Sequence, residues 1–329
     1  MTPKENFLRM INGDIPEFMP SGAYAPHLKR IEENLLTPAS APNGPIVTTL
    51  GVTYVGSEDN NWGAMPEPGN IVLHDILKWR DVVKTPDLSN IDWEAKYKSQ
   101  VEAIDRKEFC VQVGGGDYFL TLVSLMGFNG ALLAMVEEPK EVIALLEYVS
   151  EFYSTVLKQQ FIWAKPDVLG LMDDDSGERA PFFSLDVYRE LFKQFHKKHC
   201  DIAIENGAVV DRHDCGKSEQ FIDDWLDIGI KGWNSIQTMN DCVGIKEKYV
   251  GRLSMAGCWN SFATRSAEFN DHDYLRDKLA EYVDTFAPGG GFSFSAGISG
   301  SMDDPATAAK REVVKEFYFD YARDWYKNH

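Results

Sequence analysis

The sequence lacks any long uninterrupted apolar run. No stretch approaches the roughly 18 apolar residues that a membrane-spanning helix needs. The first residues, MTPKENFLRMING, have the spacing of an amphipathic helix that ends near Gly13, and they lack the apolar core of a secretory signal peptide. We therefore expect a cytoplasmic protein without a membrane partner.

Positive charge and cysteine are also scarce. The 51 acidic residues outnumber the 33 lysines and arginines, so the formal net charge is −18 and the chain should repel nucleic acid. The five cysteines are odd in number and irregularly spaced. This usage argues against a disulfide framework and favours reduced thiols that are buried or bind a metal.

Familiar nucleotide-binding and nucleophile motifs are missing as well. The triple-glycine runs at 114–116 and 289–291 fit neither G-x-G-x-x-G nor a P-loop, and no convincing G-x-S-x-G element is present. No proline-, glycine- or serine-rich linker divides the chain, so we expect a single domain over residues 1–329.

The sequence does contain a regular alternation of strand-like and helix-like segments. Candidate strands occupy residues 45–55, 109–113, 167–174, 208–215, 232–237, 252–258 and 292–297. Helical patterns, such as 185–206 and 273–287, separate most of them. This rhythm predicts an α/β fold of the (β/α)₈ TIM-barrel type, with residues 1–44 as a helical and irregular N-terminal extension.

Polar residues recur where these strands end, which is the active-site face of such a barrel. His213 and Cys215 lie two residues apart in one strand, so their side chains should point to the same side. Imidazole and thiolate are typical zinc ligands, and Cys258, at the end of another strand, is the best candidate for a third. A core histidine beside an unrelated buried cysteine is the alternative interpretation.

Other side chains are candidates for contact with a substrate. Asp173, Asp174 and Asp175 follow a strand and are candidate catalytic acids, with a helix or loop cap as the alternative role. A substrate pocket could be lined by Trp62, Tyr118, Phe128, Gln237, Trp259 and Phe294. For the aromatic residues among them, the alternative position is the hydrophobic core.

Several segments together resemble the uroporphyrinogen decarboxylase superfamily, whose members are (β/α)₈ barrels. They are MDDDSGERAPFFSLDVYRELFKQFHKKHCDIAIENGAVVDRHDCG, RLSMAGC and GGGFSFSAGIS, and the resemblance covers roughly residue 100 onward. NWGAMPEPGNIVLHDILKWRDVVKTPDLSNIDWE is similar to the corrinoid-dependent methyltransferase branch, which includes anaerobic aromatic O-demethylases. The N-terminal GDIPEFMPSGAYAPHLKR lacks the arginine-rich motif with which the decarboxylases hold carboxylates.

The resemblance implies transfer of a methyl group from a small methoxylated aromatic substrate to the cobalt of a corrinoid (cobalamin), which a transiently docked partner protein carries. It also implies zinc held by an H-x-C pair and a cysteine at the end of the last strand. His213 and Cys215 match the pair, whereas Ala296 stands where that cysteine is expected. The remaining candidates for the third ligand are Cys258, Glu58, Asp174 and Asp175.

Three other functions stay open at this point. One is transfer from a methylated corrinoid to a thiol or a pterin within the same superfamily. Another is a metal-free decarboxylase that acts on a porphyrinogen or a smaller acid. The third is a non-enzymatic module that binds a corrinoid protein for delivery.

Overall fold

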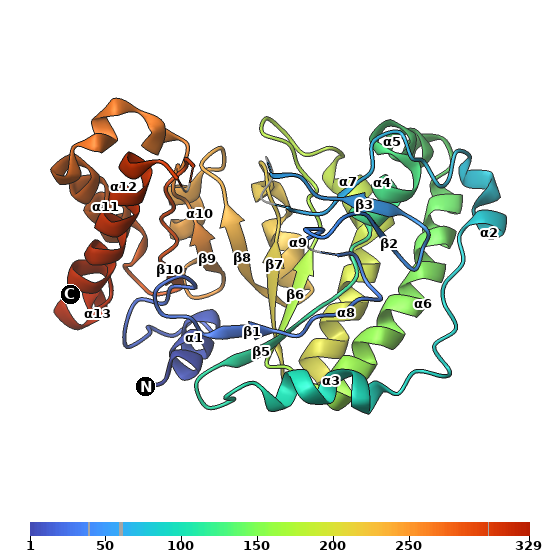
Figure 1. Ribbon diagram of the computed structural model, residues 1–329, viewed down its shortest axis with the longest axis horizontal. Helices are drawn as coiled ribbons and strands as arrows, with labels where there is room; N and C mark the ends of the chain where they lie inside the picture. Colours follow the sequence, from blue (N-terminus) through green and yellow to red (C-terminus); the bar gives the residue numbers. More distant parts are fainter. Residues whose placement is uncertain (39, 59–61, 302) are drawn as a thin grey trace.

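The computed structural model describes residues 1–38, 40–58, 62–301 and 303–329. Its centre is a curled sheet of seven parallel strands in the order β1-β5-β6-β7-β8-β9-β10 (Figure 1). Their bounds are β1 Leu28–Arg30, β5 Cys110–Gly114, β6 Val168–Met172, β7 Val209–His213, β8 Ile230–Ile236, β9 Ser254–Gly257 and β10 Phe292–Ser293. The α/β barrel expected from the sequence is confirmed, and β1, which was not predicted, lies within residues 1–44.

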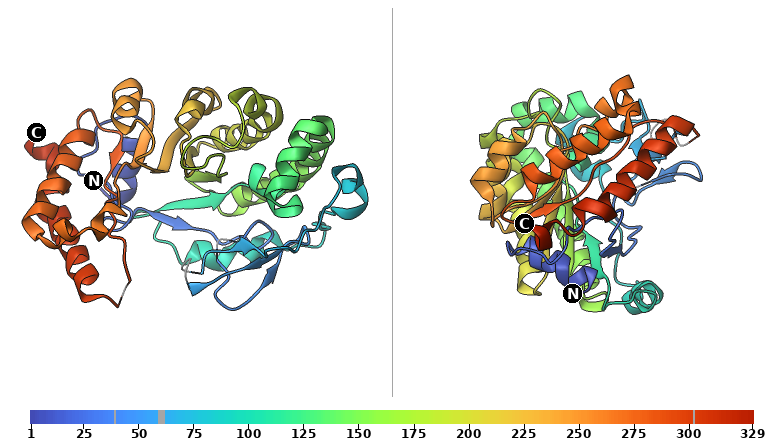
Figure 2. Two further views of the ribbon diagram at one scale, coloured as in Figure 1. Left: turned by 90° about the horizontal axis from the view of Figure 1, so that it is seen from above. Right: turned by 90° about the vertical axis from the view of Figure 1, so that its left-hand side faces the viewer.

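Helices surround the outside of the curled sheet (Figures 1 and 2). The long helices α6 and α8 lie side by side near β6 and β7, and α11 and α12 pack together at the opposite end of the sheet. The α-helices are α1 Pro3–Ile11, α2 Trp79–Val82, α3 Trp93–Glu102, α4 Phe119–Met126, α5 Phe128–Glu137, α6 Pro139–Trp163, α7 Leu185–Val187, α8 Lys193–Glu205, α9 Ile222–Asp227, α10 Cys242–Tyr249, α11 His272–Phe286, α12 Pro305–Phe317 and α13 Trp325–Asn328. Short π-helical turns at Tyr188–Phe192 and Tyr318–Ala322 precede α8 and follow α12.

A separate antiparallel sheet corrects one predicted strand. The run 45–55 does not join the barrel, because it folds back on itself as β2 (Ile46–Val47) and β3 (Thr53–Val55), which pair with each other and with β4 (Met65–Pro66). The turn between them uses Gly51 at φ +83°, and the N–H of Gly51 donates to the carbonyl of Thr48 at 3.0 Å. A glycine at positive φ interrupts an otherwise strand-like pattern here.

The amphipathic N-terminal helix α1 covers the starts of the strands. A capping box between Thr2 and Glu5 begins the helix. Its apolar face, which includes Phe7 and Ile11, packs against Cys110 of β5 and Val168 of β6. This packing closes the end of the barrel opposite the strand ends that carry the polar residues.

Residues from both ends of the chain meet beside β10. The N–H of Phe294 donates to the carbonyl of Pro20 at 2.8 Å, and the hydroxyl of Tyr318 donates to the carbonyl of Met19 at 2.8 Å. Among the described residues, no ladder of backbone hydrogen bonds joins β10 directly to β1. The N-terminal segment therefore spans the seam of the barrel.

Within the described residues, no single helix is both long and apolar enough to cross a membrane. The pair α4 and α5, which is bent by 112°, meets that requirement only in length and composition.

Candidate metal centre

Strand alternation separates the three consecutive aspartates after β6. Met172 faces a cavity in the barrel, and Asp174, two residues later, is half-buried on the same side. Asp173 and Asp175 are fully buried and point to the helix layer, where they contact residues of α8 and the outward side of β7. Consecutive aspartates thus occupy two different environments.

An inner cluster forms at the interior side of the strand ends. It consists of Asp174, His213 and Cys215, and one ligand atom from each lies within 4.8 Å of the others. The thiol of Cys215 lies 3.5 Å from Nε2 of His213, and the N–H of Cys215 donates to Oδ1 of Asp174 at 2.9 Å. The structure therefore brings His213 and Cys215 together, as their spacing predicts, and places Asp174 beside them.

Two residues behind His213 fix its orientation. Nδ2 of Asn234 donates to the carboxylate of Asp211 at 2.8 Å, so Oδ1 of Asn234 is left to accept from Nδ1 of His213 at 2.9 Å. This arrangement puts the ring proton on Nδ1 and leaves the lone pair of Nε2 facing Cys215. Gly232 makes room for the relay, because a Cβ there would lie 2.3 Å from Oδ1 of Asp211.

The donor set of the inner cluster fits a zinc ion. Zinc accepts imidazole nitrogen, thiolate sulfur and carboxylate oxygen, and catalytic sites commonly use three protein ligands and keep one position open. Support of a ligand histidine by a hydrogen bond from its other ring nitrogen is also typical. Burial, together with the charges of Asp174 and Asp214, raises the pKa of the Cys215 thiol to about 12, so a cation must displace its proton.

Cys258 does not join the inner cluster. Its thiol hydrogen-bonds with Cys242 at the start of α10, and this contact together with burial raises its pKa. Alternation along β9 predicts an inward side chain, but Gly257 and Cys258 have φ of +125° and +60°. Two successive residues with positive φ end the regular alternation of the strand, and the thiol of Cys258 lies against Cys242 of α10 on the helix side.

The other predicted ligand and two of the aromatic residues lie on the surface. Glu58 is exposed and belongs to no metal-type cluster of the described residues. Trp62 is 38% exposed and Phe128 is 41% exposed, and neither is among the residues that line the two cavities described below. Phe128 packs edge-on against Phe182 beside the start of α5.

Of the remaining candidates, two are in the core and two line a cavity. Tyr118 and Phe294 are fully buried, which corrects their predicted role in a pocket. Gln237 and Trp259 line a cavity of about 550 Å³ bounded by β8, β9 and α1. Oε1 of Gln237 also accepts from the N–H of Gly216 at 2.7 Å, which holds the loop that follows Cys215.

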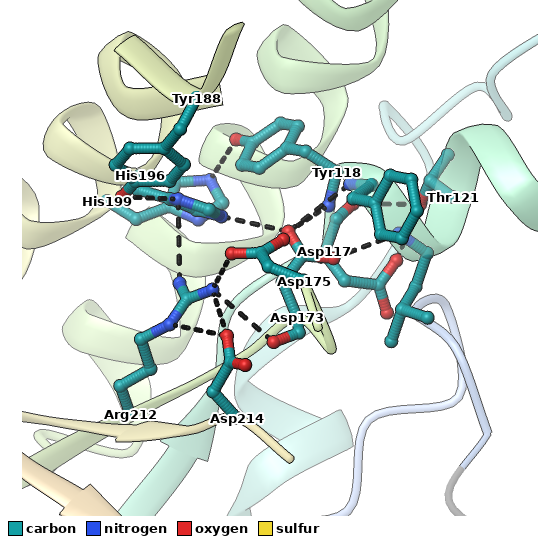
Figure 3. Close-up of polar contacts among 12 residues, drawn as sticks. Asp117, Tyr118, Thr121, Asp173, Asp175, Tyr188, His196, His199, Arg212 and Asp214 are labelled. Atoms are coloured by element: carbon teal, nitrogen blue, oxygen red, sulfur yellow. Dashed lines mark hydrogen bonds and ion pairs between the residues drawn. The ribbon is translucent and has the colours of Figure 1, made fainter. Parts of the chain in front are cut away.

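A second polar group lies on the helix side of the same strands, and we refer to it as the outer network (Figure 3). Arg212 donates to Asp175 at 2.6 Å and to Asp214 at 2.7 Å, and its guanidinium stacks on Trp225. All of its members are almost completely buried: Asp173, Asp175, His196, Arg212 and Asp214.

The pKa values of the acids in the outer network are shifted in opposite directions. Burial raises the pKa of Asp175 and Asp214 although Arg212 opposes the shift. Burial also disfavours the charge of Asp173, but the hydrogen bond from His196 and the backbone N–H of Leu120 keep its pKa below the ordinary value. Asp173 also accepts from the N–H of Tyr118 at 2.9 Å, so it caps α4, as the alternative interpretation of the aspartates proposed.

A second cavity, of about 450 Å³, adjoins the inner cluster, and we refer to it as the β5–β6 cavity. It is lined by Gly115, Asp117, Gly170 and Met172 and by the segment that follows β1. Met172 pairs with His213 in the strand register, so this cavity and the inner cluster share a wall. Its volume is in the range of small-molecule sites.

Sequence reasoning missed Asp211, Asn234 and Asp117. Asp211 had a usable signal, because it alternates with His213 and Cys215 along one strand. Asn234 reaches His213 through the register of β7 with β8, and Asp117 reaches the cavity through the loop after β5. Neither relation is visible in the spacing of residues along the chain.

Comparison with known proteins finds one family model that matches this chain and one solved structure whose fold is informative. The family model for uroporphyrinogen decarboxylase (URO-D) matches residues 96–316. A methyltransferase from Methanosarcina mazei has a similar fold, with a TM-score of 0.62, 15% sequence identity and coverage of 97% of this chain and 99% of that chain. A sugar phosphate isomerase/epimerase from Parabacteroides distasonis ATCC 8503 covers 67% of this chain and 86% of its own at 10% identity, and its TM-score of 0.33 carries no argument. No curated protein sequence matches the chain.

Proposed function

The chain belongs to the uroporphyrinogen decarboxylase family, and from that premise we propose that it is a zinc-dependent methyltransferase. The proposed reaction moves a methyl group from a methoxylated aromatic compound to the cobalt of a corrinoid held by a partner protein. The likeness of its fold to that of a methyltransferase from Methanosarcina mazei agrees with this proposal.

The observation that carries the proposal is the convergence of Asp174, His213 and Cys215 with the Nε2 lone pair of His213 turned inward. A methyl ether is unreactive because its oxygen leaves poorly as an anion. Zinc held by these three residues would act as a Lewis acid on that oxygen. The chain itself contributes a half-buried site, an oriented imidazole and an adjoining cavity that holds the aromatic ring.

The composition of the cluster favours an oxygen substrate over a thiol acceptor. One thiolate and one carboxylate donate less electron density to zinc than two thiolates would, so the ion stays a stronger Lewis acid. Cys258, which could have supplied the second thiolate, faces Cys242 instead. A decarboxylase that binds many carboxylates is disfavoured, because the β5–β6 cavity is lined by one arginine, Arg30, and by one lysine, Lys96, which is already paired with Glu33.

Metal analysis of matched cysteine variants tests the proposal. We expect about one zinc per wild-type chain, loss of that zinc in Cys215→Ser, and retention in Cys258→Ser, because only Cys215 belongs to the inner cluster. The two variants make the same chemical change at the ends of two strands of the same sheet, β7 and β9, so each controls for the other. Loss of zinc from Cys258→Ser alone would contradict the site.

A transfer assay then tests the reaction. The zinc-loaded chain is incubated with methoxylated aromatics and reduced free cobalamin, and methylation of the corrinoid is followed by absorbance. Transfer that needs both zinc and the corrinoid supports the proposal. Demethylation without any corrinoid would exclude it, and bound zinc without any transfer would favour the delivery module.

A further inference from the structure

Asp117 is a buried acid that the inner cluster does not use. It stands in the loop between β5 and α4, is 3% exposed and lines the β5–β6 cavity. Figure 3 shows it near Thr121 and Tyr118 at the start of α4. Met172, which also lines the cavity, pairs with His213 in the strand register, so the cavity lies beside the inner cluster.

The surroundings of Asp117 offer hydroxyl groups and other acids. The hydroxyl of Thr121 lies 2.7 Å from Oδ1 of Asp117 and 2.8 Å from the hydroxyl of Tyr153. Thr37 also hydrogen-bonds to the carboxyl, and Tyr54 faces it from β3. Arg30 and Lys96 line the same cavity, and Lys96 is paired with Glu33. In the part of the chain that the structure describes, no lysine, arginine or histidine forms an ion pair with Asp117.

A carboxyl group in this setting retains its proton near neutral pH. Burial and the neighbouring charges of Asp173 and Asp174 raise the pKa of Asp117 to about 7. Asp173 is equally buried but accepts from three backbone N–H groups and His196, and its pKa is lowered. Two neighbouring acids with opposite shifts have opposite roles: Asp173 holds structure as an anion, and Asp117 holds a proton beside the cavity.

We propose that Asp117 is the general acid that protonates the leaving oxygen of the methylated substrate in the β5–β6 cavity. The inference rests on the proposed function. The C–O bond breaks with its electron pair staying on oxygen, and the methyl group is taken up by the reduced cobalt of the partner's corrinoid, which supplies the electron pair of the new bond. The proton of Asp117 passes to that oxygen, which leaves as a phenol, and solvent returns a proton to the carboxylate.

Two aryl methyl ethers of similar width test this assignment. Anisole releases a basic phenolate that needs the proton, whereas 4-cyanoanisole releases a stabilised phenolate that needs it less. With zinc-loaded protein and reduced free cobalamin, we expect Asp117→Asn to slow single-turnover transfer from anisole by about 100-fold. The same variant should slow transfer from 4-cyanoanisole by less than about 10-fold.

A matched control and a second readout make the test independent of a folding defect. Glu33→Gln alters another acid of the same cavity, which is paired with Lys96 at 3.0 Å. Any slowing of transfer by this variant should be the same for anisole and for 4-cyanoanisole. Infrared difference spectra of wild type minus Asp117→Asn, without substrate, should show the carbonyl band of a protonated carboxylic acid at pH 6. That band should disappear as the pH rises through about 7.

The outcomes separate the two proposals. Equal slowing of both ethers by Asp117→Asn, or absence of the protonated carboxyl band at pH 6, would overturn the role of Asp117 and leave the methyltransferase in place. No transfer from either ether by zinc-loaded wild type would overturn the proposed function, and the role of Asp117 with it.

Discussion

Asp174 and Asp175 are adjacent in the chain and face opposite sides of the barrel wall. Asp175, on the helix side, meets the buried guanidinium of Arg212 at 2.6 Å, so the protein supplies its counter-charge. Asp174, on the interior side, meets the thiol of Cys215 and the Nε2 of His213, neither of which is a fixed cation. The outer network contains its own cation in Arg212, whereas the inner cluster gathers lone pairs that a metal ion would complete.

This comparison teaches how to separate structural from functional acids in one motif. The difference lies in the partners and not in the residue type or in burial alone. An acid that the chain pairs with a cation stabilises the fold, and an acid whose oxygen converges with other ligand atoms is suited to bind a metal ion. Four predictions test the distinction, in order of expected effect.

Removing the cation of the outer network should affect stability most. Arg212→Met keeps much of the side-chain volume but leaves Asp175 and Asp214 buried without a partner. We expect the free energy of unfolding to fall by about 3–5 kcal/mol. Chemical denaturation followed by tryptophan fluorescence measures it, and the triple variant with Asp175→Asn and Asp214→Asn should recover part of the loss. A loss below about 1 kcal/mol would show that Asp175 and Asp214 do not depend on Arg212 for their stability in the folded chain.

Removing the support of the inner histidine should affect metal binding instead. Asn234→Ala deletes the acceptor for Nδ1 of His213 and frees the ring to rotate. We expect zinc affinity to weaken by about 10–100-fold, with little change in unfolding by denaturant of the zinc-free chain. Competition with a chromophoric chelator measures the affinity. Ser235→Ala, on the same strand, is the control, and equal weakening in both variants would remove Asn234 from the site.

The inner cluster should also bind zinc with a strong dependence on pH. The thiol of Cys215 has a pKa raised to about 12 by burial and neighbouring acids, so it carries a proton at neutral pH in the zinc-free chain. Zinc must release that proton, and its apparent affinity should rise by about tenfold per pH unit between roughly pH 7 and 9. Chelator competition across this range measures the slope. A slope of zero would mean that Cys215 is not a ligand.

The smallest expected effect is on the free energy of unfolding and concerns Asp211, which supports His213 of the inner cluster through Asn234. Burial raises its pKa to about 6, so ionisation costs more in the folded chain than in the unfolded one. The wild type should therefore lose stability relative to Asp211→Asn as the pH rises from about 4 through 6, by roughly 1 kcal/mol because the group is only half-buried. Denaturation of both proteins at pH 4, 5, 6 and 7 measures the difference. A difference that is constant with pH would contradict the raised pKa.

The parts of the site that depend on local spacing were predictable. Alternation along one strand places His213 and Cys215 on one side, and the apolar runs locate the barrel strands from β5 to β10. The same alternation fails for Cys258, because two successive positive φ angles at Gly257 and Cys258 interrupt the extended conformation. No residue pattern specifies that interruption, since cysteine seldom adopts such a backbone conformation.

The other failures come from relations between distant segments. The run 45–55 has the composition of a barrel strand, yet its glycine turn makes it a hairpin outside the barrel. Tyr118 was expected beside a ligand, but its hydroxyl lies 2.9 Å from Nε2 of His199 within the helix layer. Which of two buried positions an aromatic ring takes depends on the packing of α4 against α8, which the sequence pattern does not specify.

The seam of the barrel sets an order for the synthesis of the chain. Residues 19 and 20 are synthesised long before their partners Phe294 and Tyr318, and the hydroxyl of Tyr318 bonds a carbonyl 299 positions before it. The segment that carries Met19 and Pro20 therefore has to remain without these contacts until Tyr318 has left the ribosome. Chains that stall before this point would offer their unfilled seam to chaperones and proteases.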